Sequence, residues 1–345
     1  NIFPVIHSNT GSGTGLVGVV IPPGTVSTNG TWTIAGDTLP YFLAGTVTIA
    51  SGKTLTVEPG AVVKALNDVT GIQAIGVLRS EGTPEKPITF TTAVATPTEG
   101  NWIGIYIGPE SGETSILNSR ILHAGGLGYC YYGCRGHNIG NAMDRFAAIY
   151  VDGSSPTIIG NQITNSYGNG LEVWNGSPNI TGNSISNLHE GYYAVYLDTV
   201  NTFPVMSGNA FTGTGYAGVY SPGGEMTTSG TWNKAGPALN WFLGSSLTLP
   251  ADKALTIEPG ITVFVPQGNI GLYIAGILTA NGPTEAPVIF TSRAGTPAKG
   301  DWNGIYLAPT AGNSTLANAS IRYAGGFGYC SYGCSGLGTY NGAVR

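Results

Sequence analysis

The chain has 345 residues, of which only 9% are charged, and its formal net charge at pH 7 is −5. Ordinary soluble proteins carry roughly 25% charged residues, so the surface must be neutral and rich in hydroxyl groups. The absence of a basic patch argues against nucleic acid and anionic membranes as partners. No run of about 18 apolar residues is present, and we expect this segment not to cross a membrane.

The chain repeats itself at a spacing of 200 residues. The segment 125–134 (GGLGYCYYGC) returns as 325–334 (GGFGYCSYGC), and 102–106 (WIGIY) returns as 302–306 (WNGIY). Internal repetition outweighs the domain count that length alone would suggest. We therefore expect a first super-repeat at 1–200 and a partial second one at 201–345, continuous with the first. We also expect the native chain to continue as a tandem array.

Taken in order, the first super-repeat reads as short β-branched runs separated by Gly, Pro, Asn or Ser. The runs lie at 46–49, 55–57, 61–63, 75–78, 88–91 and 103–107. This pattern is typical of strands and turns. Gly or Pro interrupts almost every window of a dozen residues, so no amphipathic helix is predicted.

A finer period occupies residues 146–220. Strand-like runs lie at 148–151, 170–173, 194–197 and 217–220, and their period of about 22–24 residues is typical of solenoid repeats. Such a period predicts a solenoid in which one period is one coil, and parallel pairing of equivalent strands stacks like residues in columns. We expect Ile149, Leu171 and Val195 to form an inward column. We expect Asn161, Asn183 and Asn209 to form an asparagine ladder inside a turn.

The Pro-x-Ile-x-Gly-Asn-x-Ile pattern, with the phrases LTVEPG (55–60), ITFT (88–91) and WIGIY (102–106), carries a resemblance to a known family. The chain resembles the right-handed parallel β-helix repeats of large secreted prokaryotic surface proteins, which belong to the pectate-lyase-like superfold. The resemblance implies an all-β, right-handed parallel β-helix with about 22–24 residues per coil. It implies little about function, because this fold hosts enzymes, adhesins and structural fibres.

The four cysteines form two close pairs, Cys130 with Cys134 and Cys330 with Cys334. Eight or nine coils per super-repeat would separate the pairs by ~40 Å, far beyond the ~7 Å that a disulfide allows between Cα atoms. Local disulfides or bridges to neighbouring molecules remain, and we favour the local ones. Zinc is the weaker alternative, because two thiolates leave a tetrahedral ion half coordinated. The loop tyrosines are candidate contact residues for a sugar or a second subunit: Tyr129, Tyr131, Tyr132, Tyr329 and Tyr332.

Acidic residues are scattered, and no pattern typical of polysaccharide-cleaving β-helices is present. Asp152 and Asp198 follow equivalent strands with Glu172 between them, which could mimic a catalytic pair, but solvated or capping acids are the simpler interpretation. His189 and Lys64 are isolated. Glu58 and Glu258 recur in Glu-Pro-Gly turns, where capping of backbone amides is favoured over calcium binding. We expect no catalytic residues, no metal site and no cofactor.

Paired cysteines and low lysine content favour an oxidising, extracellular location. The sequence thus predicts a non-enzymatic structural protein that forms a stiff rod or filament on the cell surface and associates with itself, end to end or laterally. An adhesin stalk that binds surface glycans and a polysaccharide lyase or hydrolase are the alternatives. Asn-x-Ser/Thr motifs occur at Asn29, Asn175, Asn179, Asn313 and Asn318, so glycosylation is an open question.

Overall fold

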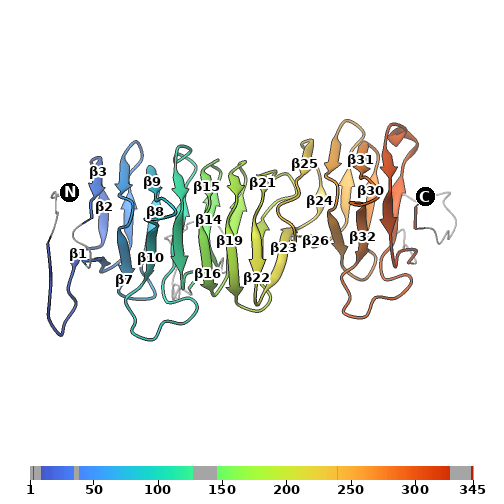
Figure 1. Ribbon diagram of the computed structural model, residues 1–345. Helices are drawn as coiled ribbons and strands as arrows, with labels where there is room; N and C mark the ends of the chain where they lie inside the picture. Colours follow the sequence, from blue (N-terminus) through green and yellow to red (C-terminus); the bar gives the residue numbers. More distant parts are fainter. Residues whose placement is uncertain are drawn as a thin grey trace. The chain divides into compact units, whose positions relative to one another are not determined.

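Short β-branched runs that end at Gly, Pro or Asn fold into strands of two to six residues, and each strand is followed by a bend. The computed structural model describes residues 3, 9–34, 39–126, 146–238, 240–326 and 343–344. Contacts divide the chain into two units. The first comprises residues 1–196 and 204–217, and the second comprises 197–203 and 218–345. Figure 1 shows the strands of both units in chain order.

In the first unit each strand pairs in parallel with the strand three places further along the chain, so three sheets run side by side. Sheet 1 contains β1 (Val19–Ile21), β4 (Tyr41–Leu43), β7 (Val62–Ala65), β10 (Ile88–Thr92), β13 (Ser119–Leu122), β16 (Gln162–Ser166), β19 (Ser184–Leu188) and β22 (Ala210–Thr212). Sheet 2 contains β2 (Gly24–Val26), β5 (Val47–Ile49), β8 (Gly71–Ala74), β11 (Gly104–Ile107), β14 (Ala147–Asp152), β17 (Asn169–Trp174) and β20 (Tyr193–Leu197). Sheet 3 contains β3 (Gly30–Trp32), β6 (Thr54–Val57), β9 (Val77–Glu81), β12 (Ser115–Leu117), β15 (Thr157–Ile159), β18 (Asn179–Thr181) and β21 (Val205–Ser207).

The second unit repeats the three-strand coil. One group of paired strands contains β23 (Tyr216–Ser221), β26 (Asn240–Leu243), β29 (Thr262–Val265), β32 (Val288–Ser292) and β35 (Ala319–Ile321). A second contains β24 (Gly224–Glu225), β27 (Leu247–Leu249), β30 (Gly271–Ile274) and β33 (Gly304–Leu307). A third contains β25 (Gly230–Trp232), β28 (Ala254–Ile257), β31 (Ile277–Asn281) and β34 (Thr315–Ala317). The 3₁₀-helix η1 (Pro309–Ala311) is the helical element of the described chain, and no helix there is long and apolar enough to span a membrane.

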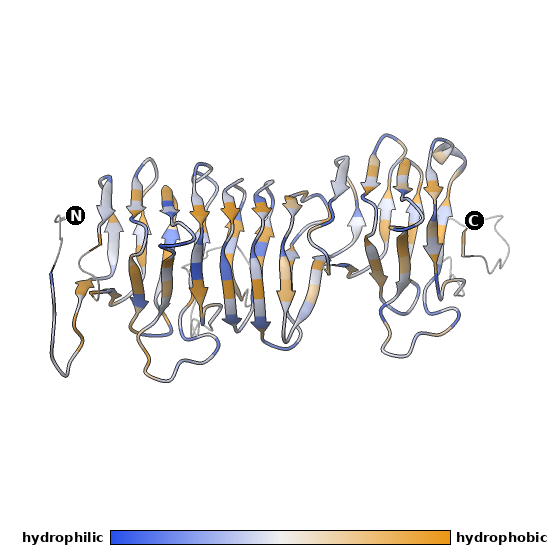
Figure 2. Ribbon diagram, viewed as in Figure 1, coloured by the Kyte–Doolittle hydropathy of each residue, from blue (hydrophilic) through white to orange (hydrophobic). Residues whose placement is uncertain are grey.

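These parallel coils confirm the predicted all-β solenoid. Inward residues stack on like residues one coil away, as Ile105 on Ile149 and Ile149 on Leu171 do, and all three are at most 1% exposed. Figure 2 shows apolar colour along the strands and polar colour at many of the bends. The core of each unit is therefore a set of aliphatic columns, which burial removes from water.

Coil length varies more than the finer repeat predicted. Asn161 lies 22 residues before its equivalent one coil later, Asn183, and Asn183 lies 26 residues before Asn209. Ser119 and Asn161 also occupy equivalent places in neighbouring coils, yet they are 42 residues apart. The strand register is the same in short and long coils, so the ladders accommodate coils of unequal length.

One predicted strand was misplaced. The run 75–78 straddles a bend, in which the amides of Ile75 and Gly76 both donate to the carbonyl of Ile49, at 3.1 and 2.9 Å. Gly76 has no room for a side chain, because a Cβ atom there would lie 2.1 Å from the Ala50 carbonyl oxygen. The apolar run therefore comprises the bend after β8, at Ile75 and Gly76, and the first two residues of β9.

Candidate functional site

The cysteines and the loop tyrosines lie outside the described residues: Tyr129, Cys130, Tyr131, Tyr132 and Cys134 in the first copy, and Tyr329, Cys330, Tyr332 and Cys334 in the second. The local disulfides, their zinc alternative and the contact role of the tyrosines therefore stay predictions. The chain enters both segments from the same anchor. The amide of Gly126 donates to the Trp102 carbonyl at 2.9 Å, and Gly326 donates to Trp302 at the same distance.

The structure brings the three asparagines of the predicted ladder together in one buried column. Asn161, Asn183 and Asn209 are at most 1% exposed. The Nδ2 amide of Asn161 donates to Oδ1 of Asn183 at 2.9 Å, and that of Asn183 donates to Oδ1 of Asn209 at 3.0 Å. The same side-chain oxygens also accept from backbone amides, those of Asn161 and Asn183, at 2.9 Å. Each asparagine thus satisfies backbone groups that its bend would otherwise bury unpaired.

The left-handed backbone of these turns lies one residue before each asparagine. Positive φ angles of 68°, 64° and 62° belong to Gly160, Gly182 and Gly208, the residues immediately before them. Glycine supplies the turn because it has no Cβ atom, and asparagine supplies the hydrogen bonds. A Gly-Asn pair in this sequence therefore indicates both a tight turn, at the glycine, and a hydrogen-bonded ladder position, at the asparagine.

Two serines that the sequence analysis did not single out extend the polar column. The Ser119 amide donates to Oδ1 of Asn161 at 2.8 Å, and the Ser119 hydroxyl lies 2.9 Å from that of Ser80. Both serines are buried. Their counterparts in the second copy are Ala280 and Ala319, so this polar extension is specific to the first unit. No repeated spacing in the sequence marks these serines.

The acids considered as a catalytic pair, Asp152 and Asp198, lie at the ends of equivalent strands two coils apart, with Glu172 on the strand between them. Asp152, at the end of β14, accepts the Tyr106 hydroxyl at 2.7 Å. Glu172, in β17, is 3% exposed and accepts from Nδ2 of Asn169 at 3.1 Å. Asp198 follows the end of β20. Tyr150, directly opposite Glu172 in the ladder, stacks on Tyr106 with ring centroids 5.8 Å apart.

Burial, together with the hydrogen bond to Asp152, raises the pKa of Tyr106 well above its ordinary value. The phenol therefore stays protonated and donates to the carboxylate at every physiological pH. The hydrogen bond from the neutral Tyr106 hydroxyl fixes the position of the Asp152 carboxylate. A catalytic acid or base instead needs a pKa near the working pH and a free path to substrate.

His189 was interpreted as isolated, and the structure shows that it is not. Its Nδ1 atom lies 2.9 Å from Oε2 of Glu99, a residue 90 positions earlier in the chain. Its ring stacks on Tyr167 with centroids 4.4 Å apart, and Tyr167 makes an edge contact with Phe146. The cluster attaches the loop after β10 to the bends that precede β17 and β20. The sequence separation hides this contact from any local pattern.

The two Glu-Pro-Gly turns bind backbone amides, as the capping interpretation expected. Oε2 of Glu58 accepts the amide of Ile34 at 2.9 Å, and Oε2 of Glu258 accepts the amide of Lys234 at 2.6 Å. Each bond joins one coil to the next. Within the described part of the chain, no group of three or more His, Cys, Asp or Glu residues lies close enough to hold a metal ion.

The two copies of the repeat reproduce their architectural hydrogen bonds. Nε1 of Trp102 donates to the Leu122 carbonyl at 2.8 Å, and Nε1 of Trp302 donates to that of Arg322 at the same distance. Asn118 and Asn318 both have positive φ and donate through Nδ2 to the carbonyls of Gly82 and Gly282. Indole and amide contacts are therefore shared between the copies.

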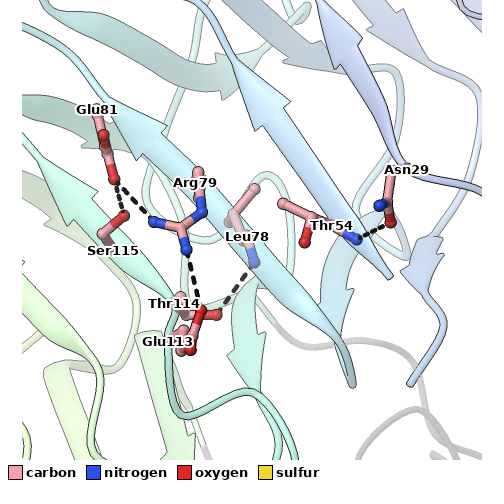
Figure 3. A network of polar contacts seen from close by, with 8 residues as sticks. All are labelled: Asn29, Thr54, Leu78, Arg79, Glu81, Glu113, Thr114 and Ser115. Atoms are coloured by element: carbon pink, nitrogen blue, oxygen red, sulfur yellow. Dashed lines mark hydrogen bonds and ion pairs between the residues drawn. The ribbon is translucent and has the colours of Figure 1, made fainter. Parts of the chain in front are cut away.

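Several charged groups of the first copy are absent from the second, although Lys53, Glu58 and Glu85 recur as Lys253, Glu258 and Glu285. In the first, Arg79 pairs with Glu113 at 3.0 Å and lies 3.6 Å from Glu81, an exposed network shown in Figure 3. The counterparts of these three residues are Thr279, Asn313 and Asn281. Charged or titratable residues are replaced at other positions too: Lys64 becomes Phe264, Glu99 becomes Lys299, and His123 becomes Tyr323.

His123 gives a pH test that uses this difference. Burial lowers the pKa of His123 below its ordinary value of 6.5, so the unfolded chain binds the proton more readily than the folded one. The stabilisation is complete above pH 6.5 and is lost as the pH falls below it. His123 has a φ angle of 60° and Tyr323 one of 59°, so His123→Tyr fits the same backbone.

We expect urea unfolding of the wild type to lose more free energy between about pH 7.5 and 5.5 than that of His123→Tyr. The carboxylates are the same in both proteins, and their titration cancels in the comparison. Identical pH dependence in the two proteins would show that His123 does not titrate differently on folding.

Two family models match the chain. A model described as "Right handed beta helix region" matches residues 103–234. A model described as "Pectate-lyase like beta helix domain" matches residues 24–131 and again 224–336, so the two matches begin at equivalent positions of the repeat. No curated protein and no solved structure matches the chain significantly.

Proposed function

Because the chain belongs to the family of pectate-lyase-like β-helix domains, we propose that it is a structural segment of an extracellular rod or filament on the cell surface, with no catalytic activity. The fold alone does not decide this, since it carries both enzymes and scaffolds. The proposal depends on what the two copies of the repeat share and on what they do not.

The observation that carries the proposal is the contrast between shared architecture and unshared chemistry. Hydrogen bonds that close bends and join coils recur in both copies, as at Glu58 and Glu258. Several charged or titratable side chains that make no such structural bond in both copies change type, as from Arg79 to Thr279 and from His123 to Tyr323. A repeated catalytic unit would require the reactive side chains to be the same in both copies.

Stiffness follows from the same contacts. Within each unit, neighbouring coils are joined by three parallel strand ladders, and in the first unit also by the buried asparagine column. Bending a solenoid requires these ladders to stretch together, because every coil contacts only its neighbours. Low charge and repeated segments favour association of copies, end to end or laterally, through many weak contacts at once.

Two other functions remain as alternatives. A glycan-binding adhesin stalk would use exposed tyrosines as stacking surfaces. Tyr273, on the outward side of β30, is 36% exposed. A polysaccharide lyase or hydrolase would use Asp152 and Asp198, and it would have to release Asp152 from the hydrogen bond that it now accepts from Tyr106.

Electron microscopy of the native material tests the proposal directly. We expect filaments or rods, and on gels an apparent size that reduction of disulfides leaves unchanged. The same sample should neither cleave acidic polysaccharides nor bind a glycan array. Dispersed monomers with polysaccharide turnover that is lost in Asp152→Asn would refute the structural function and support the enzymatic one. Glycan binding by dispersed monomers would support the adhesin.

A further inference from the structure

The five Asn-x-Ser/Thr motifs differ sharply in what their asparagines do. Asn318 is held by its Nδ2 atom, the atom that a sugar would take, which donates to the Gly282 carbonyl at 2.8 Å. Asn29 accepts the amide of Thr54 at 3.0 Å. Asn179 is part of β18, which is paired on both sides, with Thr157 and Val205 as its register partners. Three motifs are therefore built into contacts between coils.

Asn313 is different. It is exposed and lies in the turn between η1 and β34, where the amide of Ser314 donates to the Ala311 carbonyl at 2.9 Å. Within the described chain, its side chain makes no hydrogen bond that would have to break. The hydroxyl-bearing residue of the motif, Thr315, is also exposed.

The first copy explains why this asparagine is free. The equivalent position is Glu113, which pairs with Arg79 at 3.0 Å. In the second copy Arg79 is replaced by Thr279, so the charged partner is missing and an amide stands where the carboxylate stood. The turn makes the same hydrogen bond in both copies. The backbone amide of Leu78 donates to Oγ1 of Thr114 in the first, and that of Leu278 donates to Oγ of Ser314 in the second.

From these observations we propose that Asn313 is an N-glycosylation site. Glycosyl transfer would form a bond between Nδ2 of Asn313 and C1 of the first sugar of a lipid-linked oligosaccharide. The bond from C1 to the lipid phosphate oxygen breaks, and the lipid phosphate leaves with the amide proton. Asn175 is exposed as well and within the described chain makes no side-chain hydrogen bond, but Pro178 follows its Ser177 and restricts the backbone that an acceptor site must rearrange.

The inference rests on the extracellular location proposed above, since the transferase acts on the export route. The first test is mass spectrometry of the native protein, with fragmentation that separates Asn313 from Asn318. Trypsin leaves both on one peptide, 300–322. We expect an oligosaccharide mass on Asn313, and unmodified Asn29, Asn179 and Asn318. Unmodified Asn313 in a chain shown by surface proteolysis to be extracellular would overturn this inference and leave the structural function intact.

Variants sharpen the test in a host that N-glycosylates exported proteins. Asn313→Gln and Thr315→Ala should each lose the glycan completely, whereas Thr315→Ser should keep it. Glu113→Asn gives the equivalent turn of the first copy the sequence motif through Thr114 and Ser115, but Ser115 is buried and its hydroxyl donates to Glu81, so we expect this variant to stay unmodified. A glycan gained by Glu113→Asn, or a glycan on Asn318 in place of Asn313, would overturn the argument from exposure and turn geometry.

Discussion

Replacement of Asn183 by alanine is expected to lower the free energy of unfolding by about 3–5 kcal/mol. The change removes the acceptor of the Asn161 amide and a donor to the Ile158 carbonyl, each of which lies 2.9 Å from an Asn183 side-chain atom. Each buried group left unpaired costs about 1–3 kcal/mol, and the missing amide group adds a small cavity. Denaturant unfolding of the full chain measures the loss.

Amide hydrogen exchange locates the same effect. The Asn161 amide should exchange much faster in Asn183→Ala than in the wild type, because its acceptor is gone. The control is Asn313→Ala, in which an exposed asparagine is removed, and its stability should stay within about 0.5 kcal/mol of the wild type. Equal stability of Asn183→Ala and the wild type would mean that water replaces the side chain in the column.

Replacement of Trp102 by alanine is the second large change, with an expected loss of about 3–5 kcal/mol. The indole is 1% exposed, and its Nε1 atom donates to the Leu122 carbonyl at 2.8 Å. Alanine leaves a cavity and an unpaired carbonyl together. Trp102→Phe keeps most of the packing and should cost much less, about 1–2 kcal/mol.

The second copy provides an independent check of this estimate. Trp302 is fully buried and makes the equivalent bond to Arg322 at 2.8 Å. Trp302→Ala should therefore cost about as much as Trp102→Ala, and it should raise hydrogen exchange in the second unit. A loss below about 1 kcal/mol in either variant would contradict the assigned packing.

The parts of the fold that the sequence predicted are those with local periodicity. The stacking of Ile149 on Leu171 and the asparagine column follow from a 22-residue spacing, which parallel pairing converts into contact. The function of Glu58 as a cap followed from its Glu-Pro-Gly turn. In each case the prediction depends on a short motif or a regular spacing that can be read from the sequence alone.

The parts that could not be predicted lie where long loops return to the coil. The contact of Glu99 with His189 joins positions 90 residues apart, through a loop with no repeated spacing. The burial of Glu172 was missed for a related reason, because an outward position on a sheet is normally solvated. The apolar run 75–78 was misread because strand propensity does not show where a bend interrupts it.

The unequal coil lengths have a consequence for how such a chain can change over generations. Ser119 and Asn183 lie on either side of Asn161 in the chain, at 42 and 22 residues from it, and both still occupy the equivalent place in a neighbouring coil. A coil can therefore gain or lose many residues while its strands keep their partners. Lineages of this protein would diversify by insertion at bends, and an engineer could graft foreign peptides there without redesigning the core.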